Sequence, residues 1–311
     1  MNCRSDNATR VVAIVVTYNR KALLLECIEA LLSQTLSNRL DILIIDNAST
    51  DGTSDAVDRV INSNHSNVFY INTGENLGGA GGFSFGMKEA VKRGYGWAWV
   101  MDDDCIPKND ALGKLLEVDE MVGGQYGFLS SKVLWKDGSL CKMNVQRDRV
   151  IVPVRNFDKR IIKIDMASFV SLLIPTERLV KFGLPIREFY IWTDDWEFTR
   201  RLSRALPCYL VPESIVIHKS ALNVGADIAK DTADRLPRYR FLYRNDVVLY
   251  RGEGLFGLLY EVARLSAHCL KVLLFANGMR RKRLSTIVGG TIDGLRFRPK
   301  IEFPATGDDG D

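Results

Sequence analysis

The sequence contains 311 residues, of which 46% are hydrophobic and 26% are charged. These proportions are ordinary for a folded protein and exclude long disordered regions. The length allows one large α/β domain or one domain with a helical extension, and we favour the second. The formal net charge of +4 is too small to indicate nucleic-acid binding.

The cysteines and the first residues bear on the cellular compartment. Six cysteines are scattered along the chain with no pair at zinc-finger or redox spacing, which argues against a disulfide framework. No apolar signal segment precedes the first predicted strand, so we expect a cytoplasmic protein. The residues after Phe303, which include Gly307 and Gly310, are expected to fray.

Strands and helices alternate through the first hundred residues. Short apolar or β-branched runs predict strands at 11–17, 41–46 and 68–72, with a fourth ending at Asp102. Apolar residues at helical spacing predict intervening helices at 21–34, through Val57 and Val60, and at 81–93. This alternation predicts an α/β fold with a doubly wound, mainly parallel sheet. In such sheets ligands bind at the carboxyl ends of the strands, where Thr17, Asp46 and Asp102 fall.

The second half of the chain has a different pattern. Short strands with turn signals are predicted from 127 to 174, with a buried strand at 165–175, a helix within 187–206 and a last strand at 209–218. A soft boundary at 221–235 then separates a domain of about residues 1–230 from a helical C-terminal region, 231–311.

The segment 255–275 is strongly apolar, but four polar residues interrupt it at spacings of three and four: Glu261, Arg264, His268 and Lys271. A membrane-spanning helix needs about 20 nearly uncharged residues, so this segment is too polar to span. We expect an amphipathic helix, which either lies in a membrane interface or packs on the protein's own sheet or a partner subunit. The basic cluster at 280–283 favours the membrane, because it can contact anionic lipid.

Three consecutive carboxylates end the fourth strand: Asp102, Asp103 and Asp104. Hard oxygen ligands at a strand end suit Mg²⁺ or Mn²⁺, particularly when a diphosphate supplies further ligands. The alternative is a solvated acidic loop. The balance shifts toward a metal site because a second acidic cluster and a lone histidine, His218, follow downstream.

Two turns at the same sheet edge could contact a nucleotide. Residues 17–20 and Asp46 follow the first two strands, and Asp46 could accept hydrogen bonds from a base or simply form a turn. The glycine-rich stretch 76–83 precedes a helix and allows backbone N–H groups to approach an anion, although the glycines also permit tight helix packing. Its spacing and position do not match the dinucleotide fingerprint, which argues against an oxidoreductase.

The second acidic cluster, Asp194 and Asp195, lies among Tyr190, Trp192 and Trp196. A carboxylate beside aromatic walls can keep a raised pKa and act as a general base, and exposed aromatic rings commonly bind sugars. The alternative is a helix N-terminus with favourable acidic residues, which explains the charges but not the aromatic residues.

Taken together, these motifs resemble the inverting family 2 glycosyltransferases of the GT-A fold, and most of all the bacterial galactofuranosyltransferases. The resemblance runs from Val11 to His218 and more loosely through 243–246 into the C-terminal helices. The motifs that carry it are residues 15–20, 46–51, 76–83, 102–104, 192–198 and His218.

The resemblance implies a role for each motif. The half of the domain at about 1–125 would bind the nucleotide-sugar donor, and the half at about 126–230 the acceptor. Asp195 would be the general base, and Mn²⁺ or Mg²⁺ would be bound by Asp102, Asp104 and His218. The implied donor-binding residues are Thr17, Tyr18, Asn19, Arg20, Asp46, Asn76, Gly78, Gly79 and Asp103, and the implied acceptor-binding residues are Trp192, Asp194 and Trp196. Trp196 departs from the family pattern, in which a smaller residue is expected, and this puts the acceptor in doubt.

The sequence therefore predicts an inverting, metal-dependent galactofuranosyltransferase. It would use UDP-galactofuranose and a lipid-linked glycan of the bacterial envelope, and would be peripheral on the inner face of the cell membrane. A rhamnosyltransferase that uses dTDP-rhamnose would keep every motif. A nucleotide-sugar-binding protein without catalysis would tolerate loss of Asp195, which is present here.

Overall fold

The structure is a computed structural model that describes residues 7–63 and 65–305. The tail after Phe303 is predicted to fray, and its residues 306–311 lie outside the described residues. The strands are β1 (Val11–Thr17), β2 (Leu40–Asp46), β3 (Val68–Asn72), β4 (Trp97–Asp102), β5 (Cys105–Pro107), β6 (Leu129–Trp135), β7 (Arg147–Arg149), β8 (Val152–Pro153), β9 (Ile162–Lys163), β10 (Leu172–Pro175) and β11 (Tyr209–His218).

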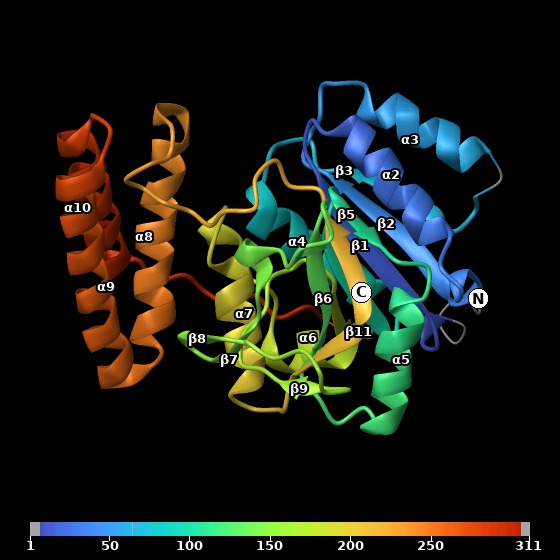
Figure 1. Cartoon of the computed structure of the whole chain (residues 1–311). Helices are drawn as coiled ribbons and strands as arrows, with labels where there is room; N and C mark the ends of the chain where they lie inside the picture. Colours follow the sequence, from blue (N-terminus) through green and yellow to red (C-terminus); the bar gives the residue numbers. More distant parts are fainter. Residues whose placement is uncertain (1–6, 64, 306–311) are drawn as a thin grey trace.

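The helices cover both faces of the sheet and form the C-terminal end of the described chain (Figure 1). They are α2 (Lys21–Leu32), α3 (Thr53–Asn62), α4 (Gly78–Lys92), α5 (Ala111–Met121), α6 (Thr176–Phe182), α7 (Asp194–Ser203), α8 (Leu236–Arg251), α9 (Gly254–Phe275) and α10 (Arg280–Arg296). Short 3-10 turns of the described chain lie between these helices and strands: η1 (Ser37–Arg39), η2 (Lys142–Asn144), η3 (Arg187–Phe189) and η4 (Ala233–Arg235).

One mixed sheet organises the first two thirds of the chain, in the order β3-β2-β1-β4-β10-β6-β11-β5 with β9 beside β11. Strands β3, β2, β1 and β4 are parallel, and β10 joins β4 in the antiparallel direction. The chain order reverses between β1 and β4, the switch point at which α/β sheets bind ligands. Register places Thr17 beside Asp46 and Val16 beside Asp102, so the predicted site residues share one edge.

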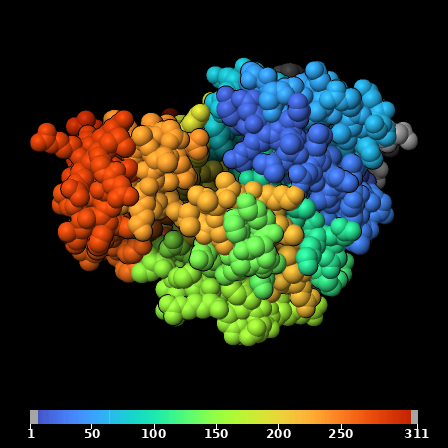
Figure 2. Space-filling view, turned by 45° about the horizontal axis from the view of Figure 1, so that its top comes forward, coloured from blue at the N-terminus to red at the C-terminus, as the bar shows by residue number. Residues whose placement is uncertain are grey.

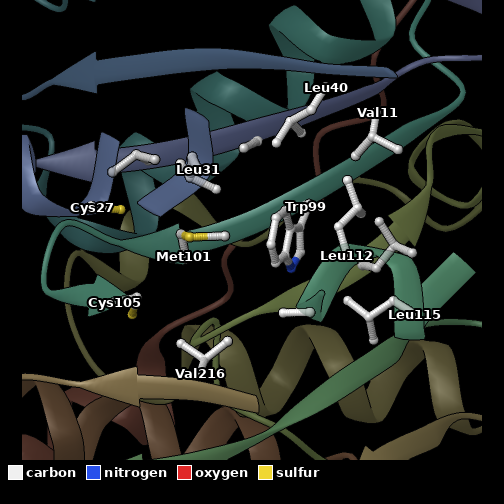
Figure 3. Packing of buried hydrophobic residues seen from close by; sticks show 14 of the residues in the cluster. Val11, Cys27, Leu31, Leu40, Trp99, Met101, Cys105, Leu112, Leu115 and Val216 are labelled. Carbon is white, nitrogen blue, oxygen red and sulfur yellow. The ribbon is translucent and has the colours of Figure 1, made fainter. Parts of the chain in front are cut away.

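Two apolar layers sandwich the sheet and fix the strand ends. One layer packs β1, β2 and β4 against α2 and α5, with Trp99 and Leu112 fully buried (Figure 3). The other packs the opposite face against α4 and α7, with Met87 and Phe198 fully buried. All seven residues of β1 and all seven of β2 are buried, as continuous apolar runs in a sheet covered on both faces should be.

The predicted buried strand at 165–175 is wrong for most of its length. Only Leu172–Pro175 forms a strand. Ser171 has a φ of 58°, a left-handed conformation that ends the extended backbone, and its hydroxyl accepts a hydrogen bond from Trp99 Nε1 at 2.8 Å. The apolar pattern reports burial, which is correct here, but burial does not require a strand.

The three C-terminal helices form one end of the molecule (Figures 1 and 2). They share a small core that includes Tyr239, Tyr243, Val272 and Ile287. Helix α10 packs closely on α8, because a Cβ atom at Gly290 would lie only 2.8 Å from the backbone oxygen of Arg240. The predicted helix at 255–275 is therefore part of a packed helical unit, in which α8 lies against both α9 and α10.

The polar stripe of α9 faces inward, and its apolar face is exposed. Glu261 is 5% exposed, Arg264 contacts Asp246, and Lys271 contacts Asp227. The large exposed side chains of α9 are all apolar: Leu255, Phe256, Leu258, Leu259, Val262, Leu270, Leu273, Leu274 and Phe275. None of the charged residues of α9 is on this exposed face.

The basic cluster at 280–283 is split by packing. Arg283 is buried and donates to the backbone oxygens of Ile228 and Asp231, so it cannot contact lipid as predicted, whereas Arg280, Arg281 and Lys282 are exposed. Within the described residues, no helix has an apolar stretch long enough to cross a bilayer.

Candidate active site

The acidic triplet is tied directly to the loop after β1. Thr17 Oγ1 donates a 2.7 Å hydrogen bond to Asp103 Oδ2. The half-exposed guanidinium of Arg20 donates to Asp103 at 3.3 Å and to Asp104 at 2.9 Å. Asp103 therefore acts as an anchor inside the site, and Arg20 supplies a cation at its entrance.

Asp102, Asp104 and His218 come together as a possible metal site, with Cys105 close by. One ligand atom from each of these four residues lies within 4.8 Å of the others. His218 Nε2 is 3.0 Å from Asp104 Oδ1. That oxygen is buried and has no hydrogen-bond donor in suitable alignment among the described residues, so a cation bound there would satisfy it.

Cys105 is a poor candidate for a fourth ligand. Its thiol is fully buried among the apolar residues beneath β4 (Figure 3). Burial and then the negative charges of Asp104 and Asp102 raise its pKa well above the usual 9.0, which keeps it protonated. A thiol is also a soft ligand, whereas Mg²⁺ and Mn²⁺ prefer oxygen.

Without a cation the carboxylates of the triplet repel one another. Burial and then Asp104 raise the pKa of Asp102 to about 6, and burial raises that of Asp103 to about 7. Burial alone would raise the pKa of Asp104, but its contact with His218 and the charge of Arg20 lower it. Burial would lower the pKa of His218, but Asp104 raises it to about 10. In the absence of a metal ion, the positive charge beside Asp104 is therefore supplied by the proton on His218 Nε2.

Asn144 orients His218 and could not be predicted from sequence. Its Oδ1 lies 2.8 Å from His218 Nδ1, so Nδ1 donates and Nε2 is directed at Asp104. Cys141 Sγ also contacts Asn144 Oδ1, at 3.0 Å. Both residues come from a short turn with no motif, and only the fold brings them to His218.

The loops after β1 and β2 brace each other. Asn19, with a φ of 54°, receives a hydrogen bond from the backbone of Thr50 and donates its own N–H to Ser49. Asp46 is fully buried, and its two oxygens accept from Ser49 N and Tyr70 Oη at 2.8 and 2.6 Å. Asp46 thus builds the turn, while Tyr18 is 45% exposed beside it and offers a ring face for stacking.

The glycine-rich stretch joins the donor side to the second acidic cluster. The N–H of Gly78 donates to Asn76 Oδ1, and the N–H of Ala80 donates to the backbone oxygen of Tyr190. A Cβ at Gly78 would lie 2.2 Å from that same oxygen, so only glycine fits. Gly79 has open space around its Cα. Gly78 therefore has a packing role here, whereas Gly79 is free to approach a ligand.

Asp194 and Asp195 begin α7 and have raised pKa values. Burial raises the pKa of Asp194 to about 6; burial and then the charge of Asp194 raise that of Asp195 well above 3.8. Asp102 contributes to the pKa of Asp195, so the two acidic clusters lie within electrostatic reach of each other. Asp195 Oδ1 accepts the N–H of Trp196 at 2.7 Å.

The two tryptophans of the cluster have packing partners of their own. Trp192 contacts Tyr239 of α8 edge-on, with ring centroids 5.1 Å apart. The guanidinium of Arg147 lies over the Trp196 ring at 4.1 Å. Both rings are partly exposed, so their predicted contact with an acceptor sugar stays a prediction.

The fold defines the class of the protein. A structure of GalNAc-T7 with UDP, GalNAc and Mn²⁺ matches 76% of this chain and 48% of its own, with a TM-score of 0.57 and 15% identity. The mannosyltransferase PcManGT from Pyrobaculum calidifontis, in complex with GDP-Man and Mn²⁺, matches 92% of this chain and 75% of its own, with a TM-score of 0.56 and 19% identity. The chain has the GT-A glycosyltransferase fold, and the predicted fold class is confirmed.

Sequence comparison relates part of the chain to a known family. Residues 12–121 match the family model described as glycosyl transferase family 2. The galactofuranosyltransferase GlfT1 of Mycolicibacterium smegmatis is 36% identical over 102 residues, and GlfT1 of Mycobacterium tuberculosis is 38% identical over 96. These matches cover 33% and 30% of this chain and about a third of the relatives' length. The predicted family resemblance is confirmed.

Proposed function

We propose that this protein is an inverting glycosyltransferase that moves galactofuranose from UDP-galactofuranose to a lipid-linked glycan of the cell envelope. One observation carries the proposal: the fold brings Asp102 and Asp104, at the end of β4, within 4.8 Å of His218, at the end of β11. The similarity to galactofuranosyltransferases over about 100 residues supports the choice of donor.

The donor would bind at the carboxyl ends of β1, β2 and β4. Tyr18 would stack on the uracil ring, and Asn19 and Asp46 would hold the loops that surround it. Thr17 and Asp103 would fix Arg20 beside the diphosphate, where the exposed half of its guanidinium offers positive charge. Gly79 would let the diphosphate approach the N-terminus of α4.

Mn²⁺ or Mg²⁺ would be held by Asp102, Asp104 and His218. The buried Asp104 oxygen, which faces His218 Nε2 without a well-aligned hydrogen bond, and the mutual repulsion of the carboxylates fit a divalent cation. When bound, the ion would neutralise charge that develops on the departing diphosphate. His218 would release its proton and be kept in the binding tautomer by Asn144.

Asp195 would carry out the proton transfer. Its carboxylate removes the proton of an acceptor hydroxyl, whose oxygen forms a bond to the anomeric carbon while the bond from that carbon to UDP breaks. Burial and the charge of Asp194 raise the pKa of Asp195, which makes its carboxylate a stronger base than that of an ordinary aspartate. Attack from the face opposite UDP inverts the anomeric configuration in one step.

A lipid surface is the proposed partner of α9. Its exposed face is uncharged along the whole helix, and Arg280, Arg281 and Lys282 are exposed just beyond its C-terminal end. Apolar area beside a cationic cluster is the combination that binds anionic membrane interfaces. Attachment there would bring the sheet edge to a lipid-linked acceptor on the inner face of the cell membrane.

Rhamnosyl transfer from dTDP-rhamnose is the second candidate, because it would use the same motifs. A thermal-unfolding titration with UDP and with dTDP, each with and without Mn²⁺, separates the two. Ligand at about 100 times its Kd adds about 2.7 kcal/mol to the stability of the folded state. We expect Mn²⁺-dependent stabilisation by UDP over dTDP. The reverse preference would favour rhamnosyl transfer, and no response to either would contradict the proposed function.

A further inference from the structure

We propose that Asn245 and Asp246 of α8 are positioning residues that hold the loop before Asp195 in its active shape, and that α9 supports them through Arg264. The inference rests on the proposed function, because it assigns these residues to the placement of the general base. Neither residue touches the donor or acceptor side chains named above; both act through the backbone and the hydroxyl of the loop 189–193.

The loop that precedes α7 has a backbone conformation that needs external support. Tyr190, Trp192 and Thr193 have φ values of 64°, 65° and 69°, in the left-handed region that non-glycine residues rarely adopt. Thr193 is β-branched and directly precedes Asp194. Such residues persist only where surrounding contacts fix them, and they concentrate at functional sites.

Asn245 supplies the first set of contacts. Its side chain is fully buried, and its Nδ2 donates to the backbone oxygens of Phe189, Ile191 and Trp192 at 3.0, 3.1 and 2.9 Å. One amide group therefore binds three carbonyls on one stretch of backbone. An aspartate at position 245 would place a carboxylate oxygen, which cannot donate a hydrogen bond, against those carbonyl oxygens.

Asp246 supplies the second contact and connects it to α9. The Thr193 hydroxyl donates a 2.6 Å hydrogen bond to Asp246 Oδ1. The other Asp246 oxygen pairs with Arg264 at 2.9 Å, and Arg264 makes two further hydrogen bonds to Glu261 at 2.7 and 2.9 Å. The side chains of Asp246, Glu261 and Arg264 are 10%, 6% and 12% exposed, so these charges depend on one another.

The network explains why the polar stripe of α9 faces inward. Helix α9 presents its apolar face outward, and its inward Glu261 and Arg264 end a chain of contacts that begins at the residue before the second acidic cluster. The charged side chains serve no solubility role there, because they are buried. They fix α8 and therefore the loop that orients Asp195.

The test compares Thr193→Val, Thr193→Ser and Tyr95→Phe in the full chain. Thr193→Val removes the hydroxyl and keeps the branched shape, whereas Thr193→Ser keeps the hydroxyl. Tyr95→Phe is the matched control, because Tyr95 Oη donates an equally buried 2.7 Å hydrogen bond to Asp41 at the opposite edge of the sheet. Amide hydrogen exchange at residues 189–196, kcat, the KM for UDP-galactofuranose and the Kd for UDP are measured.

We expect Thr193→Val to speed exchange at 189–196 at least tenfold and to lower kcat at least tenfold, with KM and the Kd for UDP unchanged. Thr193→Ser should restore most of both, and Tyr95→Phe should change neither. Unchanged exchange in Thr193→Val, or an equal loss of kcat in Tyr95→Phe, would overturn the inference. If the unaltered protein transfers no sugar, the proposed function fails, and the exchange of the loop still decides whether Asp246 holds it.

Discussion

The sheet edge and the outer face of α9 depart from the usual pattern of burial in opposite ways: the edge buries charged groups, and α9 exposes apolar ones. At the edge, charged groups such as Asp103 and Asp104 are 3% and 4% exposed. On α9, Leu255 and Leu259 are 72% and 62% exposed. Buried charges and exposed apolar stretches are the informative exceptions in a folded protein, because neither helps stability by itself. The comparison separates a region built for a charged ligand from a region built for an apolar surface.

The two regions also differ in how they are completed. The acidic edge already has internal partners in Thr17, Arg20 and His218, and a cation and a diphosphate would complete it. The α9 face has no partner within the described chain, so it is open to contact with another molecule. Substitutions in one region should therefore change its own ligand binding and leave that of the other region intact.

The largest expected effect is loss of the base. Asp195→Asn should lower sugar transfer about a thousandfold, because a positioned general base contributes about 10² to 10⁴ in rate. The Kd for UDP should not change, since the base acts in the transition state more than in the ground state. Steady-state transfer and calorimetric UDP binding check this. Loss of UDP binding in the same variant would contradict the assignment of Asp195 as the general base.

The next effect concerns the apolar face. Leu259→Glu combined with Leu270→Glu should weaken binding to vesicles that contain phosphatidylglycerol about a hundredfold or more, because each buried leucine contributes about 1.5–3 kcal/mol. The UDP response should remain. Flotation measures the binding, and Met121→Glu, on an exposed position of α5, is the control.

Two outcomes would contradict lipid docking on α9. Equal flotation of the double variant and the unaltered protein would move the membrane contact elsewhere. Dimers that dissociate only in the double variant, with no vesicle binding by the unaltered protein, would show that a second copy covers the face.

The metal site provides the third prediction. Asp104→Asn should abolish the Mn²⁺-dependent part of the stabilisation by UDP, which in the unaltered protein with Mn²⁺ totals about 2.7 kcal/mol at 100 times the Kd. Asp137→Asn, in an exposed turn, should leave it intact. Thermal unfolding with and without Mn²⁺ measures both. Full metal dependence in Asp104→Asn would exclude this carboxylate as a ligand.

The smallest expected effect is a pH dependence. As pH rises, the affinity for Mn²⁺ should rise, whereas the stability of the metal-free protein should fall. The metal-binding form of His218 is unprotonated, so Mn²⁺ affinity should rise as pH rises from 6 to 8, by up to about tenfold per unit for each proton released. In the metal-free protein the raised pKa of His218 contributes stability that is fully present below about pH 6.5 and is lost as pH rises toward 10. Calorimetry at pH 6, 7 and 8 tests the first slope; a Kd independent of pH would contradict it.

Much of the fold was accessible from the sequence, because strict apolar runs at β1, β2 and β4 each end in a polar turn. Carboxylates at strand ends carry a chemical signal, so the sequence also points to the triplet, and the structure brings it together with His218 and Arg20. Asn144 cannot be predicted in this way, because a single asparagine has no pattern and only tertiary contacts give it a role. The loose resemblance at 243–246 includes Asn245 but does not indicate what its side chain contacts.

The orientation of α9 was equally hidden. Periodicity showed that Glu261, Arg264, His268 and Lys271 share one stripe, but not which stripe faces inward. The usual assumption places the polar stripe in solvent. Here ion pairs with buried Asp246 and with partly buried Asp227 turn the stripe inward.

The most direct test of the account is the anomeric configuration of the product. The unaltered protein is incubated with UDP-galactofuranose, Mn²⁺ and a synthetic octyl galactofuranoside, and the new linkage is read by NMR. A single displacement with Asp195 as base predicts a linkage of opposite configuration to the donor. A product that retains the donor configuration would contradict the account, because it would require a covalent intermediate or attack from the face of the departing UDP.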